Sequence, residues 1–481
     1  MRVVLTQALI PSEPVEVFYW PLGLGYLAAY ARRRLEKADF VYAEGRDRIL
    51  SAGPDVVGIS TITENFRWAA QLCRELRKDF RGPIVLGGAH ISALPSCLPA
   101  EADAGVLGEG EETFVRLLEL IERRGGRWKE GLKSLRGVCR HGPGGVTVEA
   151  PRAPIADLDA IPFPDRAMLG ADWSHAVENP TAHSLLSSRG CPHACKFCFS
   201  TRFWRRIRRH GAAYVVAEAL QVRRDLGATN LNYLDDLFTS DKGRLSDIAS
   251  RLRASGLADE ASFLCTVRSD QVDEGLCKSL VRMNAGIVSM GVESGSDDVL
   301  RLMNKRTTVK DNARALARLA RHGIKVVASV LLGFPGETVR DMDRTAEFIA
   351  RHLGSDIEEF ELYPAMPYPG TWLWRHALKK GILPGEGVDG RGFGVAEATF
   401  DPVHYPYLNA SAPKETFLRY FYQLKCLSYR GQSARRLRLI DDLRRRLSTP
   451  APTPIPHGAP ASKKKQILPA LNRTALMTEV G

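Results

Sequence analysis

Residues 188–199 read Ser-Arg-Gly-Cys-Pro-His-Ala-Cys-Lys-Phe-Cys-Phe and place Cys191, Cys195 and Cys198 in one short loop at C-x3-C-x2-C spacing. Clustered thiolates select soft metals, namely zinc, copper(I) or iron–sulfur clusters. A closed structural zinc site needs a fourth protein ligand, and no Cys or His follows Cys198 at the usual spacing. The ring of His193 would have to turn back between Cys191 and Cys195. The loop therefore predicts a metal site that lacks one protein ligand.

With Phe197 directly before the last cysteine, this stretch resembles the signature of the radical S-adenosylmethionine (SAM) enzymes. The resemblance implies a [4Fe–4S] cluster held by Cys191, Cys195 and Cys198, whose remaining iron is open to the amino and carboxylate groups of SAM. The alternative is a loop that is oxidised or binds zinc. The rest of the chain tests this interpretation.

From residue 181 to about 400, apolar runs alternate with helical patterns. Strands are predicted at 183–187, 230–234, 262–267, 287–292, 326–332 and 359–363. Six strands with intervening helices indicate a partial (βα)6 barrel, in which functional residues gather at the carboxyl ends of the strands. Polar motifs stand at those ends: Asp235-Asp236, Arg268 with Asp270, Glu293-Ser-Gly, and the loop from Gly333 to Glu337.

The resemblance gives several of these residues a role in binding SAM. Asp235 or Asp236 is expected to accept a hydrogen bond from the SAM amino group. Glu293 and Lys305 are expected to contact its ribose and carboxylate, and Gly333 to pass its adenine. The alternatives are an ion-paired strand end for Glu293 and an exposed helix lysine for Lys305.

Residues 1–125 alternate short strands with amphipathic helices, which indicates βαβ units and a doubly wound, Rossmann-like parallel sheet. Ligands of such sheets bind at the carboxyl ends of the strands. The motifs PLGLGYLAAYA, VVGISTIT, IVLGGAH and GEGEETF resemble the cobalamin-binding domain that precedes the barrel in one class of radical SAM enzymes. The resemblance implies cobalamin contacts from three strand ends: Ser60, Thr61 and Thr63; Gly87, Gly88 and His90; Gly108, Glu109 and Gly110. Taken alone, each glycine could be a turn residue.

Cobalamin mutases carry a D-x-H-x-x-G motif whose histidine binds the lower face of the cobalt, and this sequence has none. His90 has no Asp two residues before it. If cobalamin binds, we expect no histidine of this domain on the cobalt.

The remaining segments are assigned from composition. Residues 126–180 are rich in Gly and Pro and are predicted to be a linker with a hairpin near residues 137–148. Residues 401–450 are predicted to form a helical C-terminal region, and the basic, Pro-rich residues 451–481 a disordered tail.

The chain of 481 residues is 44% hydrophobic and carries a net charge of +12. Much of this charge lies in the run Arg202–Arg209, in residues 435–446 and in Lys463–Lys465, so solvated faces and a basic tail are favoured over nucleic-acid binding. No apolar run is long enough to span a membrane, and nine scattered cysteines do not form a disulfide framework. A cytoplasmic location is expected, since a thiolate cluster needs a reducing compartment.

By resemblance, the expected function is cobalamin-dependent C-methylation of an unactivated carbon in a small metabolite, within natural-product biosynthesis, with electrons from flavodoxin or ferredoxin. The stretch 363–374, YPAMPYPGTWLW, resembles a motif near the end of such barrels, and its residues Tyr363, Tyr368 and Trp372 either face the substrate or pack.

Three other functions compete with this one. A non-methylating cobalamin radical SAM enzyme uses the same cofactors and stays open. A tRNA methylthiotransferase would need three more cluster cysteines, and Cys73, Cys97 and Cys139 lack the expected context. A cobalamin sensor would need neither the cysteine loop nor the barrel.

Overall fold

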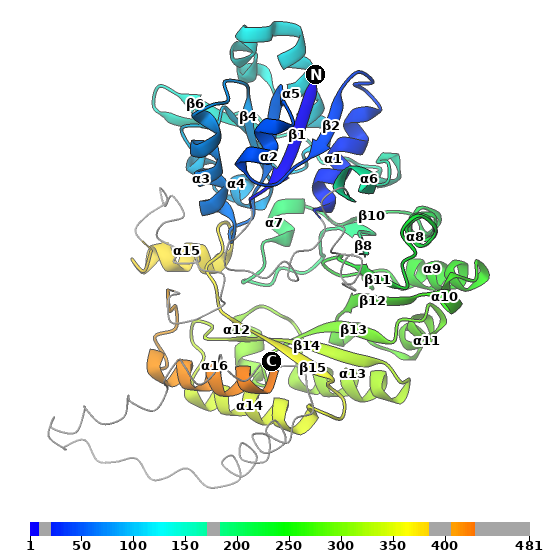
Figure 1. Cartoon of the computed structure of the whole chain (residues 1–481). Coiled ribbons are helices and arrows are strands. Elements are labelled where there is room, and N and C mark those ends of the chain that lie inside the picture. Colours follow the sequence, from blue (N-terminus) through cyan, green and yellow to red (C-terminus); the bar gives the residue numbers. More distant parts are fainter. Residues whose placement is uncertain (9–20, 171–182, 384–405, 429–481) are drawn as a thin grey trace, which may run out of the picture.

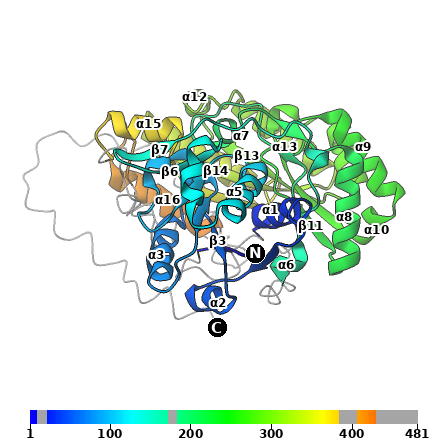
Figure 2. The same cartoon turned by 90° about the horizontal axis from the view of Figure 1, so that it is seen from above.

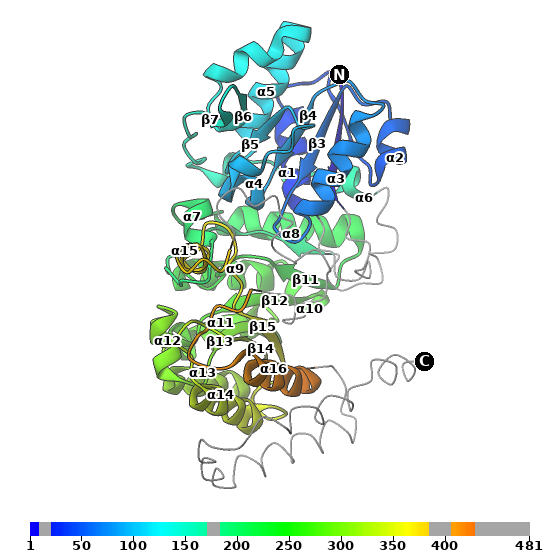
Figure 3. The same cartoon turned by 90° about the vertical axis from the view of Figure 1, so that its left-hand side faces the viewer.

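The computed structural model describes residues 1–8, 21–170, 183–383 and 406–428. They form two α/β units that follow each other along the chain (Figure 1). The first unit lies at the top of the view, and the second, which carries the cysteine loop at its start, lies below it. Figure 3 shows the two units stacked in the same way from the side.

The first unit is built on a seven-stranded sheet with the order β2-β1-β3-β4-β5-β6-β7. Strands β1 to β5 are parallel, whereas β6 and β7 are antiparallel to their neighbours. Its strands are β1 (Arg2–Gln7), β2 (Asp39–Tyr42), β3 (Val56–Ser60), β4 (Ile84–Gly87), β5 (Ala104–Val106), β6 (Val138–Gly142) and β7 (Gly145–Val148). Its helices are α1 (Leu22–Arg32), α2 (Arg46–Ser51), α3 (Phe66–Arg77), α4 (Ala89–Ala93) and α5 (Glu111–Arg124).

Both faces of this sheet are covered, because its central strands are apolar on both sides. One core packs α1 and α5 against the sheet, and a second core packs α3 against the opposite face. Seen from above, these helices flank the strands (Figure 2). The strand order reverses between β1 and β3, and ligands of doubly wound sheets bind at such a switch point.

Part of the segment predicted as a linker belongs to the first unit. The hairpin β6–β7 extends the first sheet beyond β5, with Gly105 opposite Cys139. The short helix α6 (Arg166–Gly170) contacts α1 and β2. The pairing partner of β6 is remote in sequence, which is why Gly and Pro content alone suggested a linker. Residues 171–180 of the predicted linker lie outside the described residues.

The second unit is a six-stranded parallel sheet in sequence order, β8-β11-β12-β13-β14-β15. This confirms the predicted partial barrel and all six predicted strands. The strands are β8 (Ser184–Leu185), β11 (Asn230–Tyr233), β12 (Ser262–Val267), β13 (Ile287–Glu293), β14 (Lys325–Leu332) and β15 (Glu359–Pro364). The helices are α8 (Ala212–Leu226), α9 (Lys242–Ala254), α10 (Leu257–Glu260), α11 (Glu274–Arg282), α12 (Asp297–Leu302), α13 (Val309–Arg321) and α14 (Val339–His352).

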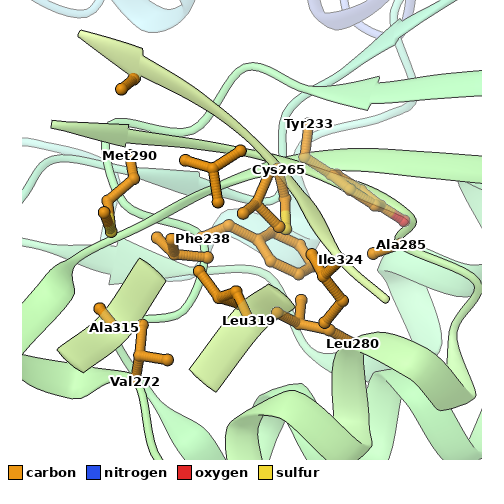
Figure 4. Packing of buried hydrophobic residues seen from close by; sticks show 14 of the residues in the cluster. Tyr233, Phe238, Cys265, Val272, Leu280, Ala285, Met290, Ala315, Leu319 and Ile324 are labelled. Carbon is orange, nitrogen blue, oxygen red and sulfur yellow. The ribbon is translucent and has the colours of Figure 1, made fainter. Parts of the chain in front are cut away.

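The core of the barrel lies between the sheet and its helices. In β12, buried residues alternate with half-buried ones, as expected for a strand with period two. Cys265 of β12 and Met290 of β13 point to the same apolar layer as Leu319 of α13 (Figure 4). The alternate residues face the barrel interior, where a ligand can bind.

Three further elements frame the site. The ribbon of β9 (Ser188–Arg189) and β10 (Arg208–Arg209) and the helices α7 (Ser200–Trp204) and α15 (Trp372–Lys379) surround the cysteine loop. Helix α16 (Lys414–Ser428) packs on β15 and α14, with Phe417, Phe421 and Leu424 in the barrel core. Residues 429–450 of the predicted helical region and the predicted tail lie outside the described residues. No helix within the described ranges is long and apolar enough to cross a membrane.

Candidate active site

The cysteine loop joins β9 to α7 at the end of the barrel that faces the first unit. Gly190 begins the loop with a left-handed backbone (φ +95°), and a Cβ there would lie 3.0 Å from the Arg206 carbonyl oxygen. The Gly190 N–H donates to Asp236 Oδ2 at 3.2 Å. The turn into Cys191 therefore requires a glycine.

Three hydrogen bonds to the backbone fix the rest of the loop to the barrel. Asn304 Nδ2 donates to the Ala194 carbonyl at 2.8 Å, and the Lys196 N–H donates to the Met303 carbonyl at 2.9 Å. The Trp372 N–H donates to the Lys196 carbonyl at 3.1 Å. The loop is thus held by the residues that follow α12 and by the first residue of α15.

The thiols of Cys191 and Cys198 are uncharged in the apoprotein. Burial raises the pKa of Cys191, and burial, followed by Asp236 and the two neighbouring thiols, raises the pKa of Cys198 to about 12. Metal binding must therefore displace these protons. Within the described residues, no three His, Cys, Asp or Glu side chains converge on one point that could hold a single ion.

Asp235 and Asp236 follow β11, as predicted, but their carboxylates have different environments. Asp235 is fully buried and accepts hydrogen bonds from the Ser187 N–H (2.7 Å), Ser187 Oγ (2.6 Å) and Ser188 Oγ (2.5 Å). Both oxygens of Asp235 are therefore used in joining β11 to the β8–β9 segment. Asp236 accepts from the Gly190 N–H at 3.2 Å, and its charge adds to burial in raising the pKa of the Cys191 and Cys198 thiols. The predicted contact with the SAM amino group thus fits Asp236 better than Asp235, and it stays a prediction.

Glu293 and Lys305 form a buried ion pair with 2.6 Å between Oε1 and Nζ. Glu293 is the last residue of β13 and has a left-handed backbone (φ +63°) next to a register shift in the pairing with β14. A strained non-glycine residue at a strand end is characteristic of functional sites. Glu293 is therefore an ion-paired strand end, as its alternative stated. Lys305 is buried in that pair and does not lie on an exposed helix, so the alternative for Lys305 is wrong.

The Gly333 loop is held by a hydrogen bond to the buried carboxyl group of Glu337. Gly333 has φ +82°, and its N–H donates to Glu337 Oε2 at 2.6 Å. Asn409 donates to the Glu337 carbonyl at 2.7 Å and accepts from the Gly336 N–H at 3.1 Å. The side chain of Phe417 packs against Gly333. Residues from the C-terminal region thus shape the loop that is predicted to pass the adenine.

Burial raises the pKa of Glu337 to about 8 from its ordinary 4.5. The folded protein keeps this proton, which the unfolded chain releases above about pH 4.5, so the wild type loses stability as the pH rises from about 4.5 to about 8. We expect Glu337→Gln to stabilise the apoprotein by on the order of 1–3 kcal/mol more at pH 8 than at pH 5. Urea unfolding at both pH values measures this, and an equal effect at the two pH values would contradict it.

At the carboxyl ends of β3 and β4, backbone contacts join two of the predicted cobalamin segments. Both the N–H and Oγ1 of Thr61 donate to the Gly87 carbonyl, at 2.8 and 2.7 Å. A Cβ at Gly88 would lie 2.4 Å from the Thr61 carbonyl oxygen, so only glycine fits there. Ser60 ends β3. A Cβ at Gly87 would meet no atom closer than 3.9 Å, so this side of the strand end leaves room for a flat ligand.

His90 is buried among side chains of the first unit. It is 1% exposed, its ring stacks on Phe66 at 4.0 Å, and Nδ1 lies 3.1 Å from Thr63 Oγ1. Burial lowers the pKa of His90 to about 4, so the ring is neutral. His90 therefore packs within the first unit, while its predicted contact with cobalamin and the expected lack of a histidine on the cobalt both stay predictions.

Glu109 belongs to a buried network of charges between the two units. Its carboxylate contacts Arg208 and lies 3.5 Å from Arg189 Nη1, while Arg189 Nη2 donates to Glu111 Oε1 at 2.5 Å. Arg189 and Arg208 are directly opposite each other in the β9–β10 ribbon. We call these four residues the interunit clamp. The side chain of Glu109 is therefore used in the clamp, so a cobalamin contact from this loop would come from the backbone of Gly108 and Gly110.

The clamp links the two predicted cofactor segments directly. Arg189 is two residues before Cys191, and Glu109 lies within the loop predicted to contact cobalamin. The Arg189 guanidinium also lies over Tyr26 of α1 and Trp204 of α7, at 5.7 and 5.5 Å. Sequence reasoning missed Arg189, Arg208, Glu111 and Asn409, since charged and polar residues far apart in the chain give no signal of pairing.

Two of the aromatic residues predicted near the barrel mouth, Trp372 and Tyr363, have different contacts. Trp372 stacks on Phe334 at 6.0 Å and receives Lys196 Nζ over its ring at 4.8 Å. Tyr363 donates through its hydroxyl to Glu361 at 2.9 Å. Trp372 therefore packs over the cysteine loop, which favours the packing alternative for this residue.

Two family models match the chain. The B12 binding domain matches residues 13–118, and the radical SAM superfamily matches residues 185–349. A protein of Pyrococcus horikoshii, named as an uncharacterized methyltransferase, is 31% identical over 376 residues, which cover 76% of this chain and 79% of the relative. The anaerobic magnesium-protoporphyrin IX monomethyl ester cyclase of Rubrivivax gelatinosus is 28% identical over 392 residues, 76% of this chain and 69% of the relative.

A solved structure shows the same fold. The radical SAM methyltransferase TsrM of Kitasatospora setae, with tryptophan and a SAM analogue bound, has a TM-score of 0.64 at 18% identity and covers 79% of this chain and 76% of its own. The chain is thus a radical SAM enzyme with a B12-binding unit. It belongs to the cobalamin-dependent, methyltransferase-like radical SAM family, whose cofactors are a [4Fe–4S] cluster, SAM and cobalamin. The family, fold class and cofactors predicted from the sequence are confirmed.

Proposed function

We propose that the enzyme transfers a methyl group to an unactivated carbon of a small metabolite in natural-product biosynthesis. The observation that carries this proposal is the interunit clamp. It joins Glu109, in the loop predicted to contact cobalamin, to Arg189, two residues before Cys191, and this supports a reaction that uses both cofactors. When bound, the cluster with SAM supplies a carbon radical, and cobalamin supplies a transferable methyl group.

The chain's residues would bind and orient these groups. Cys191, Cys195 and Cys198 would hold the cluster, and Asp236 would bind the SAM amino group beside it. The Glu293–Lys305 pair would face the SAM ribose and carboxylate, and the Gly333 loop the adenine. Thr61, Gly87 and Gly108, at three strand ends of the first sheet, would form the surface on which cobalamin binds. A cytoplasmic location and a flavodoxin or ferredoxin as electron donor are part of the same proposal.

A second function is favoured by one comparison. The Rubrivivax gelatinosus relative is named a cyclase, so a cobalamin radical SAM reaction without methylation is the alternative. The two functions differ in what they do to SAM. Methylation uses one SAM as radical source and one as methyl donor, and therefore yields S-adenosylhomocysteine together with 5′-deoxyadenosine. A cyclisation yields 5′-deoxyadenosine alone.

The test uses protein purified without oxygen and reconstituted with iron, sulfide and cobalamin. We expect about four irons and one cobalamin per chain, and loss of iron but not of cobalamin in the Cys191/Cys195/Cys198→Ala variant. Incubation with SAM, reductant and a small-molecule extract should yield both SAM products and a metabolite heavier by one CH2. 5′-Deoxyadenosine without S-adenosylhomocysteine would favour the cyclase, and iron without cobalamin would contradict both functions.

A further inference from the structure

Two segments around the cysteine loop carry only positive charge. Residues 190–209 and 364–383 contain nine Lys and Arg residues and no Asp or Glu. Six of the nine are exposed: Arg202, Arg205, Arg206, Arg375, Lys379 and Lys380. We call these six residues the basic face. The sequence alone favours a solvated helix face for the run Arg202–Arg209. Arg208 is instead buried in the interunit clamp, and the proposed chemistry gives the exposed Arg202, Arg205 and Arg206 no role.

The two segments pack against each other and form one surface. The Trp372 N–H donates to the Lys196 carbonyl, and a Cβ at Gly370 would lie 2.3 Å from the ring of Phe199. Helices α7 and α15 both lie at the end of the second unit that is nearest the first unit (Figures 1 and 3). Burial and the Arg202 guanidinium lower the pKa of Arg375, which shows that charges from the two segments act on each other.

Among the residues that the structure describes, no carboxylate forms an ion pair with the basic face. Within the described ranges, none of the six residues forms an ion pair, whereas exposed arginines elsewhere do, such as Arg223 with Glu260 and Arg251 with Asp247. Like charges held together in this way repel each other and attract an acidic partner over a distance of about 10 Å at ordinary salt. The face also begins only four residues after Cys198.

We propose that the basic face is the docking surface of an acidic electron-carrying protein of the flavodoxin or ferredoxin class. This inference rests on the proposed function, in which an electron must reach the site held by the cysteine loop. Each reductive cleavage of the SAM C5′–S bond consumes one electron, which the donor loses, and gives methionine and a 5′-deoxyadenosyl radical. RNA is the other acidic partner, but the position of the face next to the cysteine loop favours the electron carrier.

The test measures binding, not turnover. The variant Arg206→Glu/Arg375→Glu/Lys379→Glu reverses three charges of the face. The control Arg123→Glu/Arg124→Glu/Arg127→Glu makes the same change in net charge at exposed positions at the C-terminal end of α5 and just after it, far from the cysteine loop. Both reconstituted proteins are titrated with oxidised flavodoxin, oxidised ferredoxin and bulk tRNA at low and at high salt. Iron content and circular dichroism confirm that cluster and fold are intact.

We expect the face variant to bind one of the two carriers about tenfold or more weakly at low salt, and the control to bind it as the wild type does. Reduction of the variant by the reduced carrier should slow in the same proportion, while reduction by dithionite should not. The proposal would be overturned if the face variant and the control bound the carrier equally well. It would also be overturned if the wild-type protein bound neither carrier, or if its basic face bound only tRNA. Failure of methylation with intact carrier binding would contradict the proposed function alone.

Discussion

Replacing Arg189 with Met is expected to lower the free energy of unfolding of the apoprotein by about 3–5 kcal/mol. The change leaves the Glu111 carboxylate buried, with 6% of its side chain exposed, and removes its hydrogen-bonding partner. A buried charge without a partner costs far more than the pair contributes when both members are present. Urea unfolding followed by tryptophan fluorescence measures the effect.

The exposed pair of Arg223 and Glu260 provides a matched control. Arg223→Met removes the same group from a pair whose side chains are 32% and 58% exposed, and it should cost at most about 1 kcal/mol. Adding Glu111→Gln to Arg189→Met should restore part of the lost stability. If Arg189→Met were no more destabilising than Arg223→Met, the interunit clamp would not hold the units together.

A comparable loss of stability, about 3–5 kcal/mol, is expected for Lys305→Met, because the change leaves Glu293 buried and charged at a strained backbone position. The double variant Lys305→Met/Glu293→Gln should be more stable than the single variant. Both variants should bind SAM more weakly than the wild type, as measured by calorimetry on the reconstituted protein.

The exposed pair of Lys325 and Glu358 provides a control, which shows how much stability is lost when a lysine is removed from an exposed ion pair. Their side chains are 58% and 53% exposed, so Lys325→Met should change stability by less than about 1 kcal/mol. An additive double variant, or a Lys305→Met protein with wild-type stability, would show that the two charges are not coupled.

The strands of both sheets could be predicted from the sequence because parallel strands are short and apolar, and helices of different periodicity separate them. β12 begins and ends at the predicted residues, Ser262 and Val267. The hairpin β6–β7 was recognised, but its pairing with β5 was not. Strand pairing depends on contacts between distant residues, and a single sequence with Gly-rich flanks does not reveal them.

The site was predicted at the level of segments, and less well at the level of side chains. The segments predicted at strand ends do lie at the carboxyl ends of their strands, because that edge is fixed by topology, whereas Lys305 follows α12. The direction of a side chain is set by its neighbours. Ser187 and Ser188 engage Asp235, Phe66 covers His90, and Arg208 engages Glu109. These partners come from other elements, and so spacing along the chain does not predict them.

The contacts of the C-terminal region with the Gly333 loop have a consequence for synthesis on the ribosome. Domains form from the N-terminus onward as the chain emerges. Asn409 and Phe417, which hold Glu337 and Gly333, leave the ribosome only after all six barrel strands. The Gly333 loop, which is predicted to pass the adenine of SAM, is thus completed last, after Trp372, the latest of the residues that hold the cysteine loop.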